Sequence, residues 1–186
     1  MPLPRFTRLS EVRCRGILAV ARSGLADDSS YNQIISAAGI SKTSAYLYFD
    51  GKQDLIDEVL RDLASDLADV LGPWNPAADE AEFWAELHAG DVRLRSHLLA
   101  NPTEAALLDR WYEEVAAGFA DAWVRAVVED GRRLGIIRSD IDIELLVLAT
   151  AAVLRAADCW LVKLLAGGEP APPEVAWQLL AGLWSP

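Results

Sequence analysis

The sequence contains little of what metal and redox sites require. Its 186 residues include two cysteines and two histidines. Cys14 and Cys159 are far apart in the sequence and offer neither a disulfide framework nor a ligand pair, while His88 and His97 have no metal-ligand spacing to a cysteine. Isolated thiols are typical of a reducing compartment. We therefore expect no metal and no cofactor, and a cytoplasmic location.

Catalytic motifs and membrane segments are also missing from the sequence. It has no phosphate-binding loop, nucleophile elbow or H-E-x-x-H element, and the carboxylate pair Glu113-Glu114 has no recognisable partner. No N-terminal apolar segment resembles a signal peptide, and the longest apolar run, residues 145–154, is far short of the ~20 residues that cross a bilayer. These absences predict a soluble protein that is not an enzyme and has no membrane partner.

Helical periodicity is present along most of the sequence. Apolar residues recur three or four positions apart, and no segment alternates in the manner of a strand. Gly72 with two nearby prolines, Asn101-Pro102 and Leu134-Gly135 end three of the helical patterns. The predicted helices lie near residues 12–25, 30–38, 42–48, 53–72, 83–98, 112–134, 142–166 and 174–184. The sequence therefore predicts an all-α fold.

The clearest local pattern lies at residues 30–49 and predicts a helix-turn-helix. Ser30-Tyr31-Asn32-Gln33 has the form of a capping box that opens a short helix. Gly39 falls where a turn needs a positive φ, and Ser41 can cap the next helix. Ala45 and Phe49 lie four residues apart on a face that can pack inward. Two short helices joined by such a turn form a DNA-binding motif.

The residues that remain outside this motif are suited to a phosphate-lined groove. Thr43 and Ser44 lie in the first turn of the second helix, which is the part that reaches base edges, and Lys42 can reach a base or a phosphate. The set of predicted DNA-binding residues is Ser30, Tyr31, Asn32, Lys42, Thr43, Ser44, Tyr46, Tyr48 and Lys52. In the alternative interpretation, the tyrosines pack between helices and the lysines are merely solvated.

Basic residues are concentrated at the same end of the chain. Residues 1–52 contain seven Lys or Arg and four Asp or Glu, which gives a net charge of +3. The remaining residues therefore carry a net charge of −14, since the whole sequence has a net charge of −11. A basic end on an acidic body restricts where DNA can dock. The distribution favours a localised DNA-binding end, although an excess of this size is also typical of a solvated face.

Residues 11–60 resemble the N-terminal domain of the TetR family of bacterial transcriptional regulators. The resemblance is carried by Ile34-Ile35, Ala38-Gly39-Ile40-Ser41-Lys42, Tyr46, Phe49, Lys52, Leu55-Ile56 and Val59-Leu60. The chain departs from the family at Thr43, where Gly is usual, at Ala45, where a larger aliphatic residue is usual, and at Tyr48, where His is common. The resemblance implies an all-helical homodimer with a helix that connects its DNA-binding and sensing domains. We expect residues 1–52 to bind DNA, 53–72 to connect, and 73–186 to bind an effector and dimerise.

Tryptophans after residue 73 mark the second domain. Several lie in different predicted helices, so they can line one cavity for a small, apolar or aromatic effector. The predicted effector-binding residues are Trp84, His88, Asp91, Trp111, Tyr112, Phe119, Trp123, Arg155, Asp158 and Trp160. A single tryptophan at helical spacing is usually a core residue. The last two helices are apolar on nearly all sides, which predicts either a central core position or cover by a second copy.

These patterns together predict a homodimeric, ligand-responsive transcriptional regulator. A symmetric dimer would read a palindromic operator in double-stranded DNA, and we expect repression rather than activation. The alternative is a helical ligand-binding or protein-interaction module without sequence-specific DNA binding.

Overall fold

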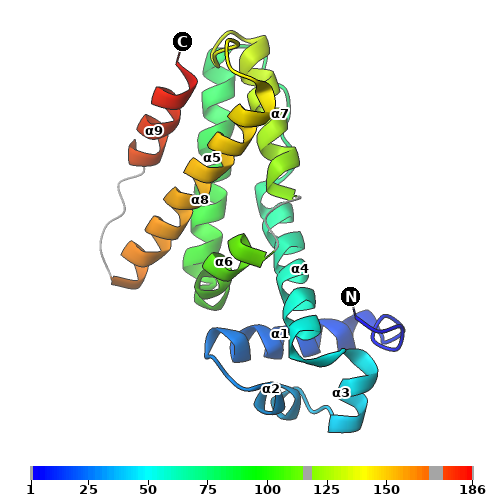
Figure 1. Ribbon diagram of the computed structural model, residues 1–186. Helices are drawn as coiled ribbons and strands as arrows, with labels where there is room; N and C mark the ends of the chain where they lie inside the picture. The colour runs from blue at the N-terminus through cyan, green and yellow to red at the C-terminus, as the bar shows by residue number, and fades with distance from the viewer. Residues whose placement is uncertain (1, 115–118, 168–173, 186) are drawn as a thin grey trace. The chain divides into compact units, whose positions relative to one another are not determined.

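The computed structural model describes residues 2–114, 119–167 and 174–185 (Figure 1). Within these ranges all regular secondary structure is α-helical, which confirms the predicted fold class. The helices are α1 (Glu11–Ala26), α2 (Tyr31–Ala37), α3 (Lys42–Tyr48), α4 (Gly51–Leu71), α5 (Glu80–Ala100), α6 (Pro102–Glu114), α7 (Phe119–Arg133), α8 (Ile143–Gly167) and α9 (Glu174–Trp184). They fall into two compact units, residues 1–66 with 101–115 and residues 67–100 with 116–186.

The expected start of a helix at residue 112 is wrong, and residues 115–118 of that expected helix lie outside the described ranges. Tyr112 lies in α6, which begins at Pro102, whereas α7 begins at Phe119. Proline is favoured in the first position of a helix because its fixed φ suits the helix and its missing N–H has no intrahelical role there. The N–H groups of Glu104 and Ala105 donate to the Asn101 carbonyl. Pro102 therefore starts a new helix as well as following the end of α5.

The first unit is built around α1, which packs against both α2 and α6. Ile17, Leu18, Ala21 and Leu25 form the buried face of α1, at the spacing of an amphipathic helix. The buried side chains contributed by the other helices of this unit are Ile34, Ile35, Ala45, Leu55, Ile56, Val59, Leu60, Leu63, Leu107, Leu108 and Trp111. This core fixes the positions of the short helices α2 and α3.

The second unit has a core shared by α5, α7, α8 and α9, and α8 lies between α7 and α9 in packing order. Phe83, Val128, Leu146 and Trp184 are among its fully buried members, one from each helix. The Trp184 indole N–H donates to the Thr150 hydroxyl over 2.9 Å, so the one polar atom of that buried indole is satisfied.

Asp130 on α7 anchors the segment that follows α4. Its carboxylate accepts hydrogen bonds from the Ala77 N–H at 2.8 Å and the Trp74 indole N–H at 3.1 Å, and from the Arg133 guanidinium. Burial by itself would raise the pKa of Asp130, but these hydrogen bonds outweigh it and hold the pKa below its ordinary value. The buried carboxylate thus replaces water for two donors of the chain between α4 and α5.

The apolar character of α8 extends further than the run at residues 145–154 predicted. An 18-residue window within Ile143–Leu164 has a mean hydropathy of 1.9, so in the described part of the chain α8 is long and apolar enough to cross a membrane by length and composition alone. The core helix of a soluble protein passes the same test. Arg155 and Asp158 interrupt this stretch in the sequence, and an unbroken run therefore underestimates it.

Candidate nucleic-acid interface

The helix-turn-helix is assembled by the local signals that the sequence contains. Ser30 and Gln33 form a reciprocal capping box at the start of α2, in which the Ser30 N–H donates to the Gln33 side chain over 2.8 Å. Gly39 has a φ of +63°, which a side chain would strain. The Ser41 hydroxyl caps α3 by accepting from the Ser44 N–H at 3.1 Å. The predicted capping residues and the predicted turn are confirmed.

Buried residues hold α3 in place from behind. Ala45 and Phe49 have no exposed surface, as their spacing predicts. Arg13 on α1 adds a contact that the sequence did not reveal, because its guanidinium donates to the carbonyls of Ala38 and Gly39, both at 3.3 Å. The turn between α2 and α3 is therefore fixed from outside as well as by its own glycine.

Five of the nine predicted DNA-binding side chains are fully available at the surface of the first unit: Asn32, Lys42, Thr43, Tyr46 and Lys52. Tyr46 is the most prominent apolar group among them, with 64% of its surface exposed. Lys42 and Thr43 are in the first turn of α3, and Lys52 is in the first turn of α4. The structure thus leaves one polar edge of α3 open to a ligand.

The other four predicted residues have partners within the protein or lie partly inside it. The hydroxyl of Ser30 is engaged with Gln33, and that of Ser44 accepts from the Ser41 hydroxyl at 2.9 Å. The ring of Tyr48 is half-buried. Tyr31 is also half-buried, and its hydroxyl is buried without a hydrogen-bond partner in the described ranges. Burial raises the pKa of Tyr31. The rings of Tyr31 and Tyr48 are therefore packed within the protein, as the alternative interpretation of the tyrosines expected.

Two of the predicted effector-binding residues of the second unit, Trp84 and His88, lie in an aromatic cluster. The Trp84 ring lies 6.3 Å from His88 and 5.9 Å from Trp184, measured between centroids, and His88 lies 5.0 Å from Trp177. These contacts bring α5 and α9 together through aromatic side chains. Trp123 packs edge-on against Trp74 instead, at 5.8 Å.

Four other predicted residues of this unit have different surroundings. Asp91 pairs with Arg95 through two contacts of 2.7 and 2.8 Å, one turn apart on α5. On α8, Arg155 is exposed, Asp158 is half-buried and Trp160 keeps 38% of its surface exposed.

The remaining predicted effector-binding residues lie on α6 and α7. Trp111 and Tyr112 are on α6 with their rings 4.7 Å apart, and they belong to the first unit. The indole N–H of Trp111 is buried and has no hydrogen-bond partner among the described residues. Phe119 begins α7, but its side chain lies outside the described residues.

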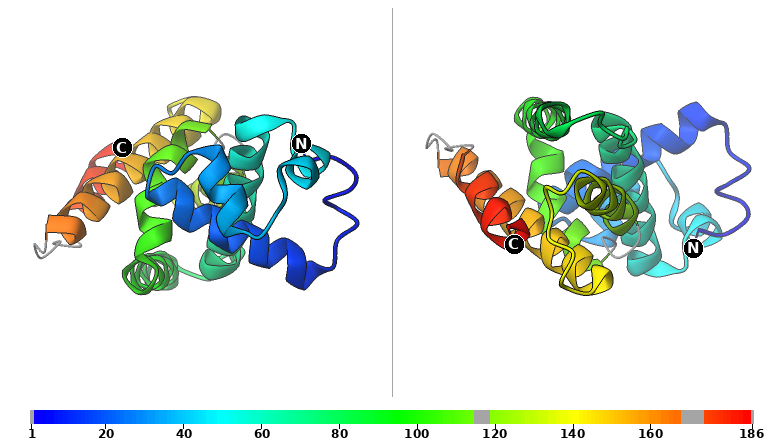
Figure 2. Two further views of the ribbon diagram at one scale, coloured as in Figure 1. Left: turned by 90° about the horizontal axis from the view of Figure 1, so that it is seen from below. Right: turned by 90° about the horizontal axis from the view of Figure 1, so that it is seen from above.

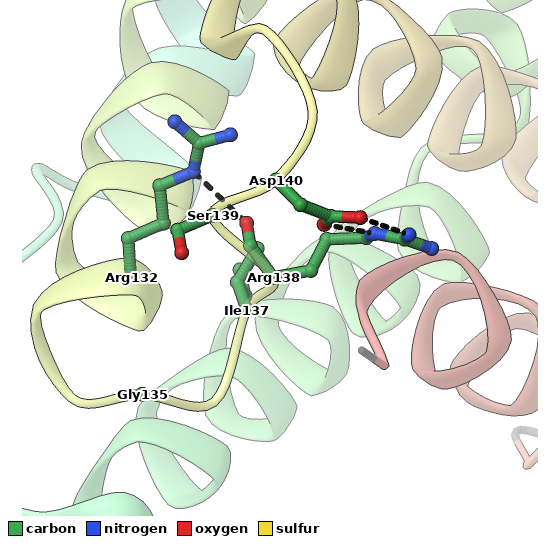
Figure 3. A pocket seen from close by; sticks show the side chains of 6 residues that line it. All are labelled: Arg132, Gly135, Ile137, Arg138, Ser139 and Asp140. Carbon is green, nitrogen blue, oxygen red and sulfur yellow. Dashed lines mark hydrogen bonds and ion pairs between the residues drawn. The ribbon is translucent and has the colours of Figure 1, made fainter.

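A cavity of about 260 Å³ lies at the loop between α7 and α8 (Figure 3). It is lined by Arg132, Gly135, Ile137, Arg138, Ser139 and Asp140, none of which is a predicted effector-binding residue. Hydrogen bonding from Arg138, at 2.6 and 2.7 Å, holds the pKa of Asp140 down at about 2. The Arg132 side chain donates to the Arg138 carbonyl over 3.1 Å. The charged side chains that line the cavity are therefore paired, Arg138 with Asp140 and Arg132 with a backbone carbonyl.

The described structure is that of an all-α protein with a helix-turn-helix whose second helix presents a polar edge. A family model for bacterial regulatory proteins of the tetR family matches residues 17–59, the segment that runs from within α1 to α4. This segment is therefore a tetR-family helix-turn-helix domain.

Individual proteins are also similar to this chain. The chain is 28% identical over 138 residues to the HTH-type transcriptional repressor KstR2 of Rhodococcus jostii (strain RHA1), an alignment that covers 63% of this chain and 62% of that relative. The fold is similar to that of a TetR-family transcriptional regulator from Haemophilus influenzae RD, with a TM-score of 0.64, 14% identity, and coverage of 93% of this chain and 94% of that one. A TetR-family regulator from Chloroflexus aurantiacus J-10-FL gives a TM-score of 0.61 at 22% identity, with 98% and 96% covered.

Proposed function

We propose that this chain is a DNA-binding transcriptional regulator, a repressor that a ligand releases from a palindromic operator. The observation that carries the proposal is the arrangement of α3. Its inward residues Ala45 and Phe49 are completely buried, whereas Lys42 and Thr43 in its first turn are exposed. A helix fixed from behind and open at its N-terminal turn is the geometry that enters a major groove.

Each side chain on this edge has a role that follows from its chemistry. The Thr43 hydroxyl is exposed and can donate to or accept from a base edge, and the Ser44 hydroxyl, which accepts from Ser41, keeps its own O–H to donate. Lys42, Tyr46 and Lys52 are exposed cationic or phenolic groups that suit the phosphate backbone, which sets the register of the protein on the duplex. Sequence preference therefore depends on Thr43 and Ser44, and affinity depends on the other three.

The exposed apolar surface of α8 and α9 supports a homodimer. Leu145, Leu148, Trp160 and Leu179 keep 60%, 61%, 38% and 58% of their surfaces exposed in the single chain. The residues of α8 in this set are spaced by three and twelve positions, which places them on one face of the helix. The two helices lie side by side in both views of Figure 2. A second copy would bury this face and place two copies of α3 on successive major grooves, on the order of 34–36 Å apart.

The aromatic side chains of the second unit support an apolar or aromatic effector. Trp84 and His88 on α5 offer flat rings that are not completely buried, with Trp177 of α9 beside them. A ligand that stacks on these rings changes DNA affinity only if it binds the released state more tightly than the DNA-bound state. The functional division that we propose keeps residues 1–52 for DNA, 53–72 for the connection and 73–186 for effector and dimer contacts.

A double substitution in α3 tests the proposal. Thr43→Ala with Ser44→Ala removes the two proposed base contacts. Discrimination between the preferred duplex and a scrambled one should fall by about tenfold, since the reading of one base pair is worth roughly 1–3 kcal/mol. The matched control is Ser65→Ala with Ser96→Ala, which removes two exposed hydroxyls from α4 and α5. Equal discrimination by the parent and the α3 variant would refute the assignment of base reading to these residues.

A further inference from the structure

The chain preceding α1 is a folded arm rather than a loose tail. We call residues 2–9 the N-terminal arm. The Leu3 N–H donates to the carbonyl of Tyr48 at 2.8 Å, and the N–H groups of Phe6 and Leu9 close turns within the arm. The Phe6 side chain is only 3% exposed, with its ring centroid 4.7 Å from that of Phe49. The arm is thereby fixed to the C-terminal end of α3.

The two arginines of this arm have no partner among the described residues. Arg5 and Arg8 are exposed, and neither makes a hydrogen bond or ion pair within the described ranges. The three arginines of α1 differ, because each has a partner inside the protein. Arg13 donates to the turn of the motif, Arg15 pairs with Glu11, and Arg22 pairs with carboxylates of α4 and α6. Arg5 and Arg8 therefore have their full hydrogen-bonding capacity available for a ligand.

The position of the arm relative to α3 suggests what that ligand is. Seven residues of helix span about 10 Å, and the arm is held at Tyr48, the opposite end of α3 from Lys42 and Thr43. The major groove is about 12 Å wide. An arm held at the far end of a helix whose first turn reads the groove floor thus lies near a phosphate strand that borders the groove. The dark blue segment begins beside the end of α3 in both views of Figure 2.

We propose that Arg5 and Arg8 bind phosphates that flank each operator half-site, as a second set of contacts beside that of Lys42, Tyr46 and Lys52. This inference rests on the proposed function and deepens it. The arm anchors affinity without reading sequence, because guanidinium contacts to phosphate oxygens are the same at every base pair. Phe6 is the positioning residue, since its buried ring fixes the arm against Tyr48 and Phe49.

The experiment compares the salt dependence of duplex binding for the full-length parent and for Arg5→Gln with Arg8→Gln. Each lost phosphate contact makes the negative slope of log affinity against log salt shallower by about 0.9. The slope of the double variant should therefore be shallower by about 1.8 for each half-site. The preferred operator sequence should remain the same. The matched control is Arg15→Gln with Arg61→Gln, which removes the same charge from two exposed arginines that already have carboxylate partners.

Three other outcomes decide against the inference. A slope equal to that of the control variant would overturn the role of the arm while leaving the proposed function intact. A change in the preferred base pairs beside the half-site would show that the arm reads a groove rather than phosphates. Failure of the folded parent to bind any duplex would overturn both proposals. Arg5→Lys with Arg8→Lys retains the charge and should restore most of the slope, which a purely structural role of the two side chains would not predict.

Discussion

Replacement of Arg22 by methionine should destabilise the first unit far more than the loss of an ordinary surface charge. The Arg22 side chain is 10% exposed and contacts Asp62 and Asp66 of α4 and Glu104 of α6, at 2.7, 2.6 and 2.7 Å. Breaking a buried ion pair typically costs about 3–5 kcal/mol, because the remaining charges lose their partner. Burial raises the pKa of Asp62 even though Arg22 opposes the shift, so this carboxylate already carries a desolvation cost.

The expected loss lies near the lower end of that range. Asp62 and Asp66 keep 32% and 48% of their side-chain surface exposed, so they regain water when the cation is removed. We therefore expect Arg22→Met to lower the free energy of unfolding by about 3 kcal/mol. The control is Arg15→Met on the same helix, whose ion pair with Glu11 is 77% and 75% exposed and should be worth at most ~0.5 kcal/mol. Urea unfolding followed by circular dichroism measures both, and equal losses would refute the reasoning.

Three further predictions concern the second unit. Because the pKa of Asp130 is lowered in the folded state, its carboxylate stabilises the fold at pH values above its ordinary pKa of 3.8. In urea titrations, Asp130→Asn should lower the free energy of unfolding by about 2 kcal/mol at pH 7. The difference from the parent should shrink as the pH falls below 3.8. A Cβ on Gly131 would lie 2.5 Å from a neighbouring isoleucine side chain, so Gly131→Ala should lower the melting temperature. A Cβ on Gly182 would meet no atom within 4 Å, so Gly182→Ala should raise the melting temperature slightly. Leu148→Glu should shift the light-scattering mass from dimer to monomer, and the equally exposed Val92→Glu on α5 should not.

The sequence predicts best where structure depends on neighbouring residues. The capping residues Ser30 and Ser41 and the turn at Gly39 act within four positions of their partners, so their pattern is readable without the fold. The start of α6 was missed because Pro102 was interpreted only as a helix stop.

Contacts between distant residues account for what the sequence did not predict in the candidate site. Arg13 contacts a turn 25 residues away, and Arg22 contacts a carboxylate 82 residues away. Neither contact leaves a period or motif in the chain. The buried hydroxyl of Tyr31 is also a product of packing between helices, and residue type alone could not reveal it.

The most direct test of the account is selection of random duplex DNA by the purified full chain, followed by measurement of affinity for the enriched sequence at about 0.05 and 0.2 M salt. The account predicts an inverted repeat, bound by a dimer, with affinity that falls by roughly 10³ or more between these salt concentrations because several phosphates are contacted. A folded protein that enriches no sequence would contradict the account and favour a helical ligand-binding module.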